Sequence, residues 1–289
     1  MNRKKIYPLY LAAIPAAVFI IFFIIPSTFG YYYAFTNWSA ARTTGLKFVG
    51  LDNIAAVFSN SKVPVAFANT LIYAGVKTVM VTLLGFVFAY ILNREIRSRT
   101  ALRTVYFIPA IFSSLVVGLI FSAVFQTRHG TLNNMLNFFG MSNIQWLGTR
   151  GTAVFAICVA EVWRNVGYAI IITLAGMQSV STDYIEAAKL DGASEWQLFR
   201  RITLPLIMPT VNVNILFSLI YGLKMFDLIY VMTGGGPGNA TESFGTLMMN
   251  EMSAGRYAQS VSVNLVFTVL LVIVSVIYQK FSSRWETVL

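Results

Sequence analysis

Four polar side chains lie inside one long apolar stretch of the chain. Glu161, Arg164, Asn165 and Tyr168 are spaced i, i+3, i+4 and i+7, so a helix would place them on one face. Because a charge at the centre of a bilayer costs about 2.5–3.5 kcal/mol, such side chains must face protein or water. An ion pair between Glu161 and Arg164 that joins helices is one interpretation. The other is a conduit wall, where polar groups replace water around a sugar and an aromatic ring covers its apolar face.

A second apolar stretch carries a similar face. Ser218, Tyr221 and Met225 have helical spacing, and beside them Lys224 and Asp227 are placed for an i, i+3 ion pair. The two tyrosines could equally be packing aromatics. Together the two faces predict two sides of one polar path.

A polar segment, residues 186–209, separates these stretches. Tyr184 to Leu190 predicts a short helix that ends at Gly192, since glycine accepts the left-handed conformation after a helix. Ser194 and Gln197 have the spacing of a capping box for a second helix. The apolar stripe of this second helix is Leu198, Phe199 and Ile202. We interpret Pro205 and Pro209 as the end of this helix and the start of the next.

The same segment combines small and charged residues. Small side chains would leave a shallow surface against which another protein can pack; they are Ala187, Ala188, Gly192 and Ala193. Charged side chains nearby could orient that partner; they are Glu186, Asp191 and Glu195. This composition predicts a helix docked in a socket of another protein. The alternative is an ordinary amphipathic hairpin between membrane helices.

Other chemistry finds no support in the sequence. There is no Gly-Lys pair for a phosphate loop, no G-x-S-x-G and no H-E-x-x-H. A single cysteine, Cys158, excludes an intramolecular disulfide, and a single histidine, His129, argues against a histidine metal site. We therefore expect no catalytic residues, no metal site and no enzyme activity in the chain alone.

Composition indicates a polytopic membrane protein. Hydrophobic residues make up 57% of the 289 positions and charged residues 11%, less than half of the roughly 25% usual in soluble proteins. We expect six transmembrane helices, at about 7–29, 67–92, 105–125, 152–174, 206–232 and 261–278.

The lysines and arginines orient these spans. The side with both termini and the 186–209 segment holds twelve of them and the other side six, so the positive-inside rule places both termini and that segment in the cytoplasm. The net charge of +10 then reflects membrane orientation, and we expect no nucleic-acid partner.

The spaced E-A-A, D-G-A and L-P elements of the 186–209 segment resemble the cytoplasmic EAA loop of permease subunits of ATP-binding cassette importers. The T-G-G-G-P run from Thr233, interpreted as part of a flexible outer turn, and the F-V-G-L-D-N run from Phe48 are similar to maltose-type sugar permeases. The resemblance implies an all-α membrane protein with the type I importer (MetI-like) fold.

The resemblance also implies site residues. It assigns the coupling to an ATPase to Glu186, Ala187, Ala188, Asp191, Gly192, Ala193, Leu204 and Pro205. For substrate contact it points to Glu161, Asn165, Tyr168, Ser218, Tyr221, Gly222 and Met225, to which Arg164 is added from the shared helix face.

The organisation and partners follow from the same family. We expect an N-terminal helix and outer loop (1–66), an importer core (67–281) with a coupling segment at 181–209, and a cytoplasmic tail (282–289) in a prokaryotic cell membrane. The implied partners are a dimeric ATPase that binds ATP and Mg, a second permease in a heterodimer or, as the alternative, a homodimer, and an extracellular solute-binding protein. No cofactor is expected in this chain.

Two other functions fit parts of the sequence. One is an ion-coupled secondary transporter with Glu161 or Asp227 as the coupling carboxylate. The other is a permease of the same architecture for amino acids, metals or phosphate. Glu161 favours a neutral sugar or a cationic group over an acidic sugar, unless Arg164 balances its charge.

Overall fold

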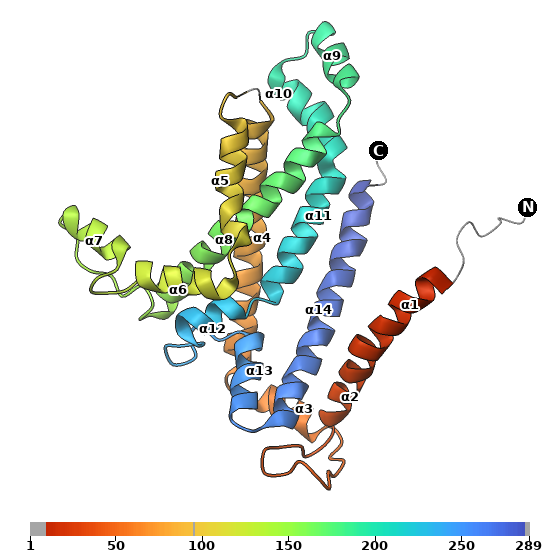
Figure 1. The fold of residues 1–289 in the computed structure, drawn as a ribbon, viewed down its shortest axis with the longest axis vertical. Helices are drawn as coiled ribbons and strands as arrows, with labels where there is room; N and C mark the ends of the chain where they lie inside the picture. The colour runs from red at the N-terminus through yellow and green to blue at the C-terminus, as the bar shows by residue number, and fades with distance from the viewer. Residues whose placement is uncertain (1–9, 95, 287–289) are drawn as a thin grey trace, which may run out of the picture. The chain divides into compact units, whose positions relative to one another are not determined.

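The computed structural model describes residues 10–94 and 96–286, and helices dominate this part of the chain. It contains no strand there, only isolated bridges between Thr36 and Phe48 and between Ser39 and Arg42. Figure 1 shows the helices in chain order. Their bounds are α1 Tyr10–Phe19, η1 (π-helical) Ile20–Ile24, α2 Ile25–Tyr33, α3 Asp52–Ser59, α4 Val63–Asn93, α5 Arg99–Ile111, α6 Ser114–Val124, α7 Thr131–Phe138, α8 Arg150–Gln178, α9 Thr182–Leu190, α10 Glu195–Leu198, η2 (π-helical) Phe199–Thr203, α11 Leu204–Leu223, α12 Asp227–Thr233, α13 Phe244–Ser253 and α14 Tyr257–Glu286.

Five helical stretches are long and apolar enough to cross a membrane, and a bent pair of helices would make a sixth span if it is counted as one. The five, within the described residues, are Leu11–Tyr33, Val63–Asn93, Arg150–Gln178, Glu195–Leu223 and Tyr257–Ser282. The bent pair is α5 with α6. An all-helical membrane protein is therefore confirmed.

The expected third span is not one straight helix. α5 and α6 meet at 98°. Phe112 and Ser113 have extended backbones at the break, and the Ser113 hydroxyl accepts a hydrogen bond from the Val116 amide to begin α6. The two helices together are apolar enough for one span, so the sequence predicted the span without its bend.

The expected fifth span is interrupted, and its start lies earlier than predicted. α11 ends at Leu223, a non-helical step follows at Lys224–Phe226, and α12 begins at Asp227. At the other end, one helical path runs from α10 through η2 into α11, so the predicted stop and restart at Pro205 and Pro209 is wrong. Pro205 lies in the first turn of α11, where the missing N–H costs least, and the Leu204 amide donates to Phe199 in a π-type bond just before it.

The chain divides into two compact units. One comprises Met1–Asn60 and Leu247–Thr268, and the other Ser61–Thr246 and Val269–Leu289. In the first unit the amide of Ala40 donates to the Gly255 carbonyl and that of Ala258 to the Trp38 carbonyl, so the loop after α2 pairs with residues far along the chain.

The second unit holds the candidate site. Its core is built on α4, α8 and α11, which contact one another, and α5 packs along α8. Close approach depends on small residues: a Cβ on Gly85 would lie 2.5 Å from the Ala169 side chain. The buried clusters of this unit include one around Tyr73, Ile157 and Leu228 and another around Leu92, Ile170 and Ile207.

Candidate functional site

A polar cavity of about 440 Å³ lies where α4, α8 and α11 meet. Five of the eight side chains expected to contact substrate line it: Arg164, Asn165, Tyr168, Ser218 and Tyr221. The structure thus brings the two polar faces of the sequence to one space. Lys77, Asn214 and Phe217 line it as well.

Glu161 lies behind this cavity rather than at its surface. Its Oε1 is 2.5 Å from the Lys77 Nζ, and both side chains are 5% exposed. Its Oε2 is 3.7 Å from Arg164 Nη1, too far for a hydrogen bond. The carboxylate is therefore committed to Lys77, and the two cations, not the carboxylate, reach the cavity wall.

Asparagine side chains give the cavity free acceptor atoms. Asn165 donates its amide N–H to the Glu161 carbonyl at 2.8 Å, and Asn214 donates to the Thr173 hydroxyl at 2.8 Å and the Ala169 carbonyl at 3.3 Å. These bonds use the nitrogens and fix both amides, so their oxygens remain to accept from a solute hydroxyl. Asn214 was not among the predicted residues, although it lies four and seven residues before Ser218 and Tyr221 on the same helix face.

Two of the expected substrate residues are placed elsewhere. Met225 is buried in the core with Leu228 and Ile229, and Gly222 lies against α4, where an added Cβ would be 2.7 Å from the Ala74 Cα. Within the described residues, Lys224 and Asp227 form no salt bridge, because the non-helical step after α11 separates them. The expected i, i+3 pair at this place is wrong.

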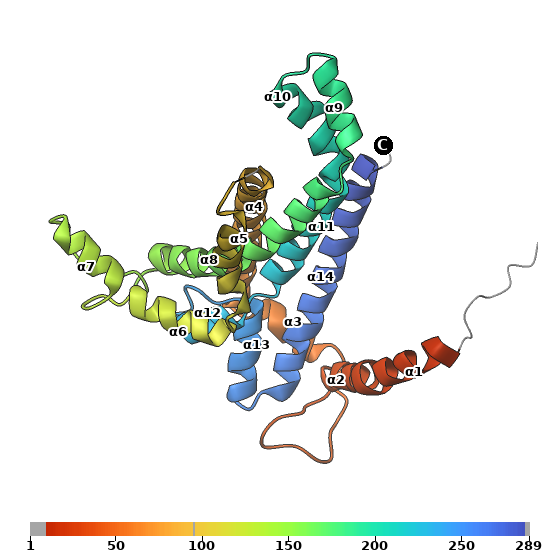
Figure 2. The same ribbon diagram turned by 45° about the horizontal axis from the view of Figure 1, so that its top comes forward.

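The coupling segment forms the two expected helices, α9 and α10. Gly192 has φ of +78°, which stops the first helix, and the Ala193 amide donates back to the Ala188 carbonyl. Ser194 and Gln197 then form the predicted capping box, with bonds of 3.3 and 2.8 Å. In both ribbon views α9 and α10 lie at one end of the second unit, away from α6 and α12 (Figures 1 and 2).

The surface of this segment is more apolar than expected. Tyr184, Leu190 and Trp196 are 61%, 89% and 65% exposed. Glu186, Ala187, Asp191 and Gly192 are exposed, Ala193 is half-buried and Ala188 is buried. Leu204 and Pro205 are half-buried at the start of α11, so they connect the segment to the cavity helix. Large exposed apolar groups beside charges are the composition of a protein interface.

The loop after α12, which begins at Gly234, is buried at its far end. Thr241, Glu242 and Ser243 are buried. Asn69 donates to the carbonyls of Ala240 and Glu242 at 2.9 Å, and the Tyr73 hydroxyl donates to the Thr241 carbonyl. α4 therefore holds the far end of this loop inside the second unit.

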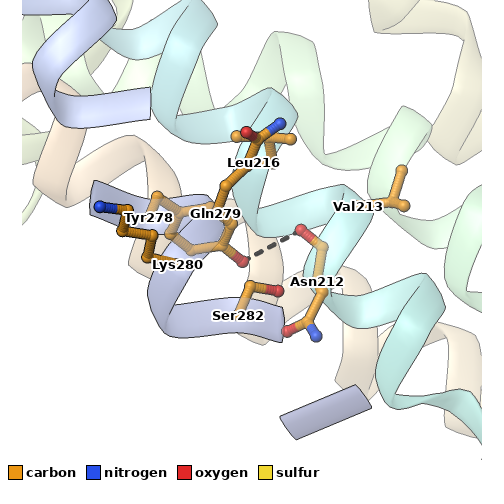
Figure 3. A pocket seen from close by; sticks show the side chains of 7 residues that line it. All are labelled: Asn212, Val213, Leu216, Tyr278, Gln279, Lys280 and Ser282. Carbon is orange, nitrogen blue, oxygen red and sulfur yellow. Dashed lines mark hydrogen bonds between the residues drawn. The ribbon is translucent and has the colours of Figure 1, made fainter. Parts of the chain in front are cut away.

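A larger cavity, of about 520 Å³, lies between α11 and the end of α14 (Figure 3). The Tyr278 hydroxyl donates to the Asn212 carbonyl across it at 3.1 Å. It contains none of the expected substrate residues. The smaller cavity, where the polar side chains converge, is the better candidate for a solute site.

Comparisons with known proteins agree with this architecture. Residues 81–287 match the family model described as binding-protein-dependent transport system inner membrane component. The chain is 33% identical to the trehalose/maltose transport system permease protein MalF of Thermococcus litoralis, over 94% of this chain and 92% of the relative. It is also 33% identical to the multiple sugar-binding transport system permease protein MsmF of Streptococcus mutans, over 94% of each.

Solved structures show the same fold. A chain from the crystal structure of a bacterial ABC transporter involved in the import of alginate matches with a TM-score of 0.84 at 22% identity, covering 96% of this chain and 95% of that one. At this identity the match shows the fold alone. The fold is that of an ABC importer permease, and with the family match over most of its length the chain belongs to the binding-protein-dependent transport system inner membrane components.

Proposed function

We propose that this chain forms half of the translocation path of an ATP-driven sugar importer. The observation that carries the proposal is the likeness, over nearly the whole chain, to permeases named for trehalose/maltose and for multiple sugars. The cavity supports it, since amide oxygens, a serine hydroxyl and two tyrosine rings are groups that bind hydroxyl-rich solutes.

Energy for transport comes from a separate dimeric ATPase, which binds ATP and Mg and receives the coupling segment. The exposed Tyr184, Leu190 and Trp196 support this docking role. ATP-driven closure of the ATPase moves α9 and α10 as a rigid body. The helical path from α10 into α11 then carries the movement to the cavity wall.

The proposed complex has further members. Because an ATPase dimer offers two clefts and this chain offers one coupling segment, a second permease completes the path in a heterodimer, and an extracellular binding protein delivers the sugar. Both termini and the coupling segment face the cytoplasm, in line with the distribution of lysine and arginine.

The alternative of an ion-coupled transporter gains no support from the geometry. Its candidate Glu161 is bound to Lys77 and lies away from the cavity surface. Asp227 is not at that cavity either.

Proteoliposomes test the proposal directly. The tagged chain is purified from its native membrane with its bound partners and reconstituted with the binding protein, and uptake of labelled maltose and other sugars is followed with ATP inside or outside. We expect uptake that requires ATP on the coupling-segment side and survives a protonophore. Uptake driven by an ion gradient without ATP contradicts the proposal.

Orientation has its own test. Leu190→Cys and Met141→Cys variants are treated with a membrane-impermeant maleimide in intact cells and in inverted vesicles; the native Cys158 is buried. The proposed orientation predicts labelling of position 190 only in inverted vesicles and of position 141 only in intact cells.

A further inference from the structure

The charges around the polar cavity do not balance. Its lining contains two cations, Lys77 and Arg164, and among the described residues no acidic side chain lines it. Glu161, the carboxylate in contact with the pair, lies behind the wall. Two positive charges therefore share one negative charge.

Arg164 is the cation with unused hydrogen-bonding capacity. Its Nε is buried without a hydrogen-bond partner, and its nearest contact to Glu161 is 3.7 Å. Its side chain is 26% exposed, in contrast to 5% for Lys77. A guanidinium can donate five N–H groups in a planar fork that matches a carboxylate, so Arg164 presents an open half of such a pair.

Lys77 has a different place in the cavity. Its ammonium bonds Glu161 and lies 5.8 Å from the centre of the Tyr221 ring. Glu161 and Tyr221 hold it in position, and its charge adds to that of Arg164 at the cavity wall. A net positive charge within a span is costly unless a counter-charge arrives.

We propose that this cavity accepts a sugar that carries a carboxylate, with Arg164 as its direct partner and Lys77 as the second source of positive potential. The inference rests on the proposed importer function and names its substrate class. The oxygens of Asn165 and Asn214 accept from the sugar hydroxyls, and Tyr168 and Tyr221 offer ring faces. From the sequence, Glu161 weighed against an acidic sugar; Lys77 reverses that balance.

Direct binding to the permease separates this claim from the selectivity of the binding protein. The purified importer complex in nanodiscs, without binding protein, is titrated with α-1,4-digalacturonate and with α-1,4-galactobiose, which differ in their carboxylates. We expect the acidic disaccharide to bind about tenfold more tightly or better. In Arg164→Gln this preference is largely lost, whereas Arg164→Lys, which keeps the charge but not the planar fork, retains part of it.

A matched control removes a charge of the same sign elsewhere. Lys224 is exposed and does not line the cavity, so Lys224→Gln leaves the preference unchanged. Equal or tighter binding of galactobiose by the native complex, no binding of digalacturonate at millimolar concentration, or an unaltered preference in Arg164→Gln each overturns the inference. ATP-driven uptake of a neutral sugar would then leave the importer function standing, whereas absence of ATP-driven uptake for every sugar removes that function as well.

Discussion

The Lys77 ammonium and the Glu161 carboxylate lie 2.5 Å apart and are both 5% exposed, so α4 and α8 share a buried ion pair beside the cavity. A buried pair is not strongly stabilising compared with apolar residues of the same size. Removing one partner is different, because it leaves the other charge buried and uncompensated.

Glu161→Gln should therefore destabilise the chain by about 3–5 kcal/mol. Thermal unfolding in detergent measures this loss. The double variant Lys77→Met with Glu161→Gln removes both charges and should recover most of the stability. A Glu161→Gln variant as stable as the native chain would contradict the pairing.

The contact between Lys77 and Glu161 could not be predicted from the sequence. The helical spacing of Glu161, Arg164, Asn165 and Tyr168 was enough to place them on one face, and three of them line the cavity. In the sequence, Lys77 is a lone charge within the apolar run at 67–92. Its partner is 84 positions away, and no local pattern encodes a contact between separate helices.

The coupling segment was far more predictable than the cavity. Its signals are local: Gly192 for a left-handed turn, and Ser194 with Gln197 for a capping box, each acting within a few residues. The bend at Phe112–Ser113 and the break after Leu223 were not predicted, because a pattern of apolar residues does not show where a helix changes direction.

Gly192 offers a test of the turn geometry itself. Nothing lies within 4 Å of a Cβ built there, so a new side chain meets no neighbour, but φ of +78° strains a β-branched residue. Gly192→Val should cost about 1–3 kcal/mol locally, displace α10 relative to α9, and lower ATP-driven uptake more than ATP hydrolysis.

Asparagine tolerates the left-handed conformation, so Gly192→Asn is the matched control and should retain most uptake. Membrane levels of both variants are checked by immunoblotting. Equal uptake by the valine and asparagine variants would show that the turn does not set the position of the docking helix.

Trp196 tests the apolar part of the coupling surface. Because its side chain is 65% exposed, Trp196→Ser should leave the fold intact while weakening ATPase binding by more than about 1 kcal/mol, as expected of a buried interface tryptophan. Affinity of the purified permease pair for the ATPase is the measurement.

The control for Trp196 is another exposed aromatic outside the segment. Phe138 on α7 is 86% exposed, and Phe138→Ser should leave ATPase affinity unchanged. If both variants bind the ATPase as tightly as the native chain, the docking surface does not include Trp196.

A Tyr221 variant distinguishes a role in helix packing from a role in substrate binding. Its side chain is 61% exposed and lines the cavity, so its removal leaves no void in the core. Tyr221→Ala should raise the sugar concentration needed for half-maximal uptake by about tenfold, equal to about 1.4 kcal/mol, with normal assembly of the complex on size-exclusion chromatography.

Tyr221→Phe is the matched control. It keeps the ring that faces both the cavity and the Lys77 ammonium, and should retain most affinity. Loss of assembly in Tyr221→Ala would instead identify Tyr221 as a packing residue, because a side chain that only lines a solute path is not required to hold helices together.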